Sequence, residues 1–259
     1  MTRSNAPLHA FVLHHYMWSE SSLILDVFSR EQGRLVLVAK GARRPYSQLR
    51  SVLLPFQRLL LSLGRAPASD SASEVQNLRG AEWAGGQAML TGAALFSGLY
   101  LNELLMKLLA RSDPHADLFD TYAQTLPHLA NPSEAAVQAS LRAFELKLLQ
   151  TLGVLPDLSL VTLTQQTVQV DAGYTLDPQA GVLRAKASDT GSVSGHALVG
   201  LQAALQHGSL LALQHACAAH LSELRLVLRG LLHYHLGSPH LRTRQLMLDV
   251  QALERSPSS

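Results

Sequence analysis

The stretch that decides the fold runs from Gly33 to Ser69 and reads GRLVLVAKGARRPYSQLRSVLLPFQRLLLSLGRAPAS. It contains seven basic residues and no Asp or Glu, whereas the rest of the chain carries 14 basic and 19 acidic residues. The seven are Arg34, Lys40, Arg43, Arg44, Arg50, Arg58 and Arg65. A concentrated positive block is typical of a surface that binds a polyanion, because cations release the condensed counterions of a phosphate backbone. A solvated basic loop without a ligand is the alternative interpretation.

Apolar runs alternate with this charge in a pattern that predicts short strands. Leu35–Ala39 is apolar and partly β-branched, whereas Lys40–Pro45 is interrupted by Gly and Pro and is expected to form a loop. The expected strands are 8–16, 23–28, 35–39, 52–54, 59–63 and 74–83. This succession of short strands favours a five-stranded oligonucleotide-binding barrel, with Phe28 and Phe56 filling its core.

Beyond Trp83 the spacing of apolar residues becomes helical. Leucine-rich segments predict helices over 95–108, 118–129 and 141–152, and the last of these ends at Gly153 as a C-terminal cap. Helical spacing returns over 196–236. The intervening residues, Pro156–Gly195, contain short strand-like pieces among Asp, Gly and Pro, and predict a small irregular insert with a hairpin.

These patterns predict an α+β fold in which an N-terminal five-stranded OB-fold barrel is followed by an all-α helical domain with a small irregular hairpin insert. The expected boundaries are 1–82 for the barrel, 83–248 for the helical domain and about 156–195 for the insert. Residues 249–259 are expected to form a loose C-terminal tail, and Met1–Pro7 a disordered N-terminus.

The chain offers little for catalysis or for metal binding. Its single cysteine, Cys217, excludes an intramolecular disulfide and a zinc site built on cysteine pairs. Its histidines are poorly spaced for a shared metal; His14 and His15, for example, face opposite sides of a strand. No Gly-x-Ser-x-Gly motif and no phosphate-binding Gly-x-x-x-x-Gly-Lys loop occurs. We therefore expect no enzyme, no catalytic residue, no metal and no cofactor.

Neither a membrane-spanning run nor a secretory signal is expected in this sequence. A cytoplasmic, nucleoid-associated protein is the best interpretation. The residues expected to contact DNA are Arg34, Lys40, Arg43, Arg44, Tyr46 and Arg50. Tyr16 and Trp18 are also aromatic residues close to the block, but Tyr46, beside Arg43 and Arg44, is the preferred candidate for stacking on a base.

The motifs resemble the bacterial recombination mediator family RecO in their order and spacing. The similar stretches are WSESSLILDVF at Trp18–Phe28, LVAKGARR at Leu37–Arg44, YLNELL at Tyr100–Leu105, LRAFEL at Leu141–Leu146 with Leu152-Gly153, and Leu236-Gly237 followed by LRTRQL at Leu241–Leu246. Many members carry four cysteines in a zinc-bound hairpin equivalent to Pro156–Gly195, where this chain has none. It therefore resembles the zinc-less members.

The resemblance implies DNA repair and recombination. Such proteins bind single- and double-stranded DNA, anneal complementary strands, contact the acidic C-terminal tail of single-stranded-DNA-binding protein, and load RecA together with RecR. The resemblance places Arg142 at the position that the family uses for the tail, and the leucine-rich helices around it suggest a groove. The partner-binding residues expected there are Leu101, Leu105, Lys107, Arg142 and Leu148.

Two classes of function stay open on the sequence. One is a DNA-binding recombination mediator. The other is a protein-interaction scaffold whose basic barrel binds an acidic partner rather than DNA. Both use the same positive block, and they differ in how steeply affinity falls with salt.

Overall fold

A computed structural model of the chain describes residues 6–64, 75–85, 89–186, 189, 191–237, 241–243, 245–246 and 250. The predicted loose ends therefore lie almost entirely outside the described residues. The chain divides into two compact units. One comprises Met1–Leu126 together with Leu241–Ser259, and the other comprises Pro127–His240.

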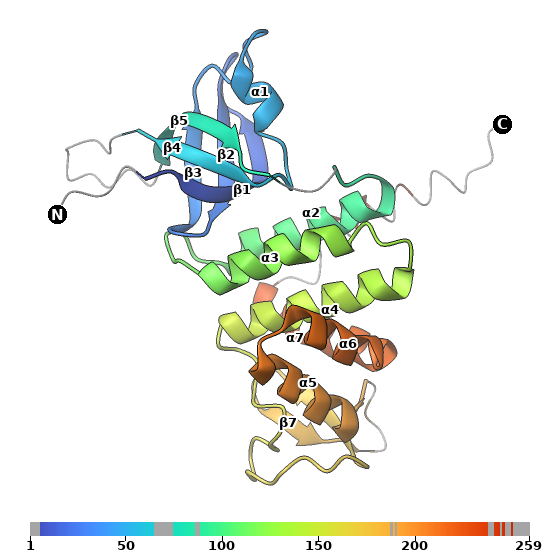
Figure 1. Ribbon diagram of the computed structural model, residues 1–259. Helices are drawn as coiled ribbons and strands as arrows, with labels where there is room; N and C mark the ends of the chain where they lie inside the picture. The colour runs from blue at the N-terminus through green and yellow to red at the C-terminus, as the bar shows by residue number, and fades with distance from the viewer. Residues whose placement is uncertain are drawn as a thin grey trace, which may run out of the picture. The chain divides into compact units, whose positions relative to one another are not determined.

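The N-terminal strands form a closed five-stranded barrel, as the sequence predicts (Figure 1). The strands are β1 (Leu8–Met17), β2 (Leu23–Ser29), β3 (Gly33–Ala39), β4 (Leu59–Leu63) and β5 (Val75–Trp83). Their order around the barrel is β1-β2-β3-β5-β4, and β4 returns to pair with β1. The β3–β5 pair is parallel and the other pairs are antiparallel. This closed Greek-key arrangement is the OB-fold.

The barrel interior is filled by every second residue of its strands. Ala10, Val12, Leu25, Val27 and Leu37 are fully buried members of this cluster. Burial of these aliphatic side chains is the main term that stabilises the barrel.

The predicted barrel-core phenylalanines are buried, but neither belongs to the cluster inside the barrel, so that prediction is wrong. Phe28 alternates with Val27 and therefore points outward, where its ring lies 5.5 Å from that of Phe119 in α3 (Ala116–His128). Phe56 packs against Gly98 of α2 (Gly92–Leu108), where an added Cβ would lie 2.8 Å from the ring. The large aromatic rings thus attach helices to the outside of the barrel, which the small aliphatic residues fill.

A β-bulge interrupts β1 between Val12 and His14, where the register with β2 shifts. The extra residue, Leu13, is buried, and its carbonyl accepts a hydrogen bond of 2.9 Å from the Asn102 side chain of α2. The Asn102 amide oxygen in turn accepts one from the Tyr122 hydroxyl at 2.5 Å. This network satisfies the backbone oxygen at the bulge, and burial raises the pKa of Tyr122.

The predicted strand at Val52–Leu54 is wrong, because the segment begins as a short helix, α1 (Gln48–Val52). Leu49, Val52 and Leu53 pack on the barrel core. Their spacing of three and four residues places them on one face of a helical turn, whereas the run of consecutive apolar residues suggested a strand.

The remaining elements agree with the predicted helices and insert (Figure 1). In the second unit, α4 (Glu134–Thr151) contacts α6 (Leu210–Ala218) and α7 (Leu221–Leu236), and α5 (Gly195–His207) contacts α6.

The insert carries a small antiparallel sheet of order β7-β6-β8, formed by β6 (Gly173–Asp177), β7 (Gly181–Arg184) and β8 (Val193–Ser194). The strand-like piece Val168–Val170 is not one of its strands. None of the helices within the described residues is long and apolar enough to cross a membrane.

Candidate nucleic-acid interface

The loop that follows β3 is anchored to the turn between β1 and β2. The Arg43 backbone amide donates to the Ser21 carbonyl and its guanidinium to the Ser19 carbonyl, each at 3.0 Å. Gly41 adopts a φ of 72°, a left-handed conformation that favours glycine. Ala42 points into the barrel core. The loop therefore has a defined course, with its charged side chains outside.

Five of the six residues predicted to contact DNA are brought together on this loop and the helix that follows it. Lys40, Arg43, Arg44 and Arg50 are exposed, and none forms an ion pair with any residue the structure describes. The Tyr46 side chain is 99% exposed. We call these five residues the basic loop surface.

Arg34 lies elsewhere, in a contact between the barrel and the C-terminal end of α2. Its side chain is only 15% exposed and pairs with Asp26 through two hydrogen bonds of 2.8 and 2.7 Å. It also donates to the carbonyls of Met106 and Leu109. The hydrogen bonds to Asp26, together with its negative charge, raise the pKa of Arg34 although desolvation opposes the shift. The Arg34 guanidinium therefore forms its hydrogen bonds with groups of the protein itself.

Arg58, a further member of the basic block, is also absent from the basic loop surface. Arg58 is half-buried and its guanidinium lies 5.9 Å from the centre of the Phe119 ring. Arg65 lies outside the described residues. Of the six members that the structure describes, four are therefore exposed and two are packed against apolar or acidic groups.

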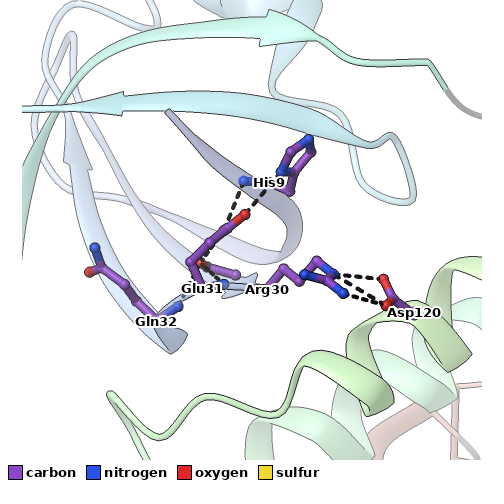
Figure 2. A network of polar contacts seen from close by, with 6 residues as sticks. His9, Arg30, Glu31, Gln32 and Asp120 are labelled. Carbon is purple, nitrogen blue, oxygen red and sulfur yellow. Dashed lines mark hydrogen bonds and ion pairs between the residues drawn. The ribbon is translucent and has the colours of Figure 1, made fainter. Parts of the chain in front are cut away.

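A separate polar network connects the β2–β3 turn to α3 (Figure 2). Arg30 contacts Asp120 with a shortest distance of 2.8 Å, and hydrogen bonds from Arg30 lower the pKa of the Asp120 carboxyl despite its partial burial. Glu31 accepts hydrogen bonds from the backbone and the imidazole of His9, at 3.0 and 2.9 Å. These two carboxylates are therefore bonded to Arg30 and His9, which lie outside the basic loop surface.

The five predicted partner-binding residues occur on two helices, α2 and α4, that belong to different units. Leu101, Leu105 and Leu148 are fully buried. Lys107 pairs with Glu103 at 3.2 Å, and Arg142 pairs with Glu145 at 2.8 Å. Only the two cations keep exposed side-chain surface, and the partner site stays a prediction.

Tyr16 and Trp18, which the sequence favours less than Tyr46 for stacking, lie at the end of β1, before the turn that anchors the loop. Tyr16 is 50% exposed near the end of β1 and Trp18, just beyond it, is 66% exposed. Their spacing of two residues was the available signal, because alternate residues of a strand share a face. Within the described residues, no group of three or more His, Cys, Asp or Glu side chains is arranged to hold a metal ion.

The closed barrel, the exposed cations at its rim and the helices that follow define the class of OB-fold proteins with a helical C-terminal region. The family model "Recombination protein O N terminal" matches residues 4–83, and "Recombination protein O C terminal" matches residues 89–245. The chain belongs to the RecO family of DNA repair proteins, and its role is in DNA repair and recombination.

Individual relatives extend this similarity over nearly the whole chain. "DNA repair protein RecO" of Verminephrobacter eiseniae is 54% identical over 245 residues, which cover 94% of this chain and 96% of that protein. The protein of the same name from Polaromonas naphthalenivorans is 50% identical, covering 96% and 98%. That from Delftia acidovorans is 47% identical, covering 94% and 96%.

Proposed function

We propose that this chain is a recombination mediator that binds single- and double-stranded DNA through the basic loop surface. The observation that supports the proposal is the group of four exposed cations, held on an OB-fold barrel, that have no acidic partner among the residues the structure describes. In this proposal Lys40, Arg43, Arg44 and Arg50 contact phosphates, and Tyr46 stacks on a base. Arg34 supports them indirectly, because it fixes β3, from which the loop emerges.

We further propose that the chain promotes annealing of complementary strands and, with RecR, loads RecA on DNA coated by single-stranded-DNA-binding protein. The family membership supports these steps and partners. None of them requires a covalent intermediate or a cofactor. The alternative, a scaffold whose basic barrel binds an acidic protein, uses the same cations and is separated from DNA binding by the first experiment below.

Replacing Arg43 and Arg44 together by Ala is expected to weaken single-strand binding and to flatten its salt dependence. Each neutralised phosphate of a single strand contributes about 0.7 to the slope of log affinity against log salt, so loss of two contacts lowers the slope by about 1.4. The measurement is fluorescence anisotropy of a labelled oligonucleotide at several salt concentrations.

The matched control for this experiment is Arg225→Ala with Arg229→Ala, which removes the same charge from exposed positions of α7. The control protein is expected to keep the wild-type slope. Equal slopes in all three proteins would contradict the assignment of the loop. Absence of DNA binding by the wild type, together with binding of an acidic peptide, would favour the scaffold.

Annealing is expected to need the cations but no nucleotide. Neutralised phosphates allow two strands to approach, so complementary oligonucleotides should pair faster with the protein than without it. The Arg43→Ala, Arg44→Ala protein should lose most of this acceleration, and added ATP should change nothing. Fluorescence quenching between labelled strands measures the rate, and a strict requirement for ATP would refute the expectation.

A further inference from the structure

The end of β1 presents two aromatic rings on one face of the sheet. Tyr16 is paired with Ile24 of β2, and the next residue, Met17, with Leu23. The Trp18 amide donates to the Ser22 carbonyl at 3.2 Å, so the ladder continues through Trp18. Because side chains alternate along a strand, Tyr16 and Trp18 point to the same side.

The bulge at Leu13 decides which side this is. Before the bulge, Ala10 and Val12 point into the barrel; after it, His14 is paired with Asp26, whose neighbours Leu25 and Val27 are the inward residues. One inserted residue therefore turns the following even-numbered positions outward. Without it, Tyr16 and Trp18 would face the inner side.

The turn that follows Trp18 is bonded to the basic loop surface. The Arg43 guanidinium binds the carbonyl of Ser19, the residue next to Trp18. Trp18 is 66% exposed, an unusual exposure for a large apolar side chain, and it is one of only two tryptophans in the chain. An aromatic surface beside exposed cations is the combination that binds bases and phosphates of a single strand together.

The spacing of the rings favours an extended strand. Residues two apart on a strand are separated by about 6.6 Å, roughly twice the ~3.4 Å rise between bases of one duplex strand. Stacked bases of a duplex do not offer their faces, whereas the bases of an extended single strand do.

We propose that Trp18 and Tyr16 form a base-stacking platform that makes this interface prefer single-stranded over double-stranded DNA. The proposal rests on the proposed DNA binding and adds to it the class of nucleic acid that the site selects. Phosphate contacts by the basic loop surface act on both kinds of DNA, and the platform acts only on unpaired bases.

The experiment uses the Trp83→Phe protein, in which Trp18 is the sole tryptophan. A saturating single-stranded oligonucleotide is expected to quench its fluorescence, and a blunt duplex is not. In the wild-type background, Trp18→Ala is expected to weaken single-strand binding about 5- to 150-fold and to leave duplex binding unchanged. Trp18→Phe, which keeps an aromatic face, should retain most of the affinity.

An oligonucleotide with an abasic tract tests the base contact itself. It keeps the phosphates and lacks base faces, so wild type and Trp18→Ala should bind it equally. Trp83→Ala is the matched control, because Trp83 is also exposed, and it should not alter the preference. Equal loss of single-strand and duplex affinity in Trp18→Ala, or an equal loss on the abasic tract, would overturn the platform while leaving DNA binding intact. Failure of the wild type to bind any DNA would overturn both proposals.

Discussion

Replacement of Arg34 by Met is expected to lower the free energy of unfolding of the barrel by about 3–5 kcal/mol. Arg34 is the ion-pair partner of Asp26, whose side chain is 6% exposed. Its loss would leave that carboxylate buried without its cation, and would also remove donors from the carbonyls of Met106 and Leu109. Breaking one partner of a buried pair costs far more than the pair itself contributes.

Urea unfolding followed by tryptophan fluorescence measures this effect, because Trp18 and Trp83 both lie in the barrel region. Arg44→Met is the matched control: it removes an exposed arginine that forms no ion pair with any described residue, and it should change stability by less than about 0.5 kcal/mol. The double variant Asp26→Leu, Arg34→Met should recover much of the loss, since no charge remains buried. Equal stability of Arg34→Met and Arg44→Met would contradict the structural role given to Arg34.

Replacement of Arg142 by Met is expected to destabilise the helical unit by a similar amount, about 3–5 kcal/mol. The Arg142 side chain is 12% exposed and its partner Glu145 is fully buried, at 2.8 Å. Burial and the nearby Glu145 carboxylate raise the pKa of Cys217 to about 12, an indication of how poorly this region is solvated. Without Arg142 the buried Glu145 carboxylate loses this ion pair. Circular dichroism of thermal unfolding measures the loss.

Because Arg142 is expected to stabilise the helical unit, the predicted binding of the acidic tail at Arg142 needs a test that separates binding from stability. A loss of tail binding in Arg142→Met could come from unfolding, so the informative protein is the double variant Arg142→Met, Glu145→Met, which removes both charges. If Arg142 holds the tail, this protein should melt cooperatively and bind a fluorescent tail peptide at least tenfold more weakly, the cost of one charge-assisted contact of about 1.5–3 kcal/mol.

Lys147→Met is the matched control for tail binding. Lys147 lies on the same helix, and its ammonium group donates to Gln150 at 2.9 Å. It should keep wild-type affinity. Tight binding of the peptide by the folded double variant would place the tail site away from Arg142.

The sequence by itself determined the local structure of much of this protein. Alternating and consecutive apolar residues with glycine turns predicted strands at 23–28 and 35–39, which the structure has as β2 and β3, and leucines at helical spacing predicted α2, α3 and α4. These patterns depend on the period of the local backbone. The position of the positive block was also plain from the sequence, because charge is a property of composition.

Tertiary structure decided which of those cations remain available. The sequence alone does not distinguish Arg34 from Arg43, because both are arginines of one basic stretch. In the fold, Arg34 pairs with Asp26 and donates to the carbonyl of Met106 in α2, 72 residues away, whereas Arg43 stays exposed. Likewise the Leu13 carbonyl at the bulge accepts a hydrogen bond from the Asn102 side chain, 89 residues away, and this bulge turns Tyr16 and Trp18 outward. A partner distant in the chain leaves no periodic signal, so side-chain exposure at the interface could be settled only by the folded contacts.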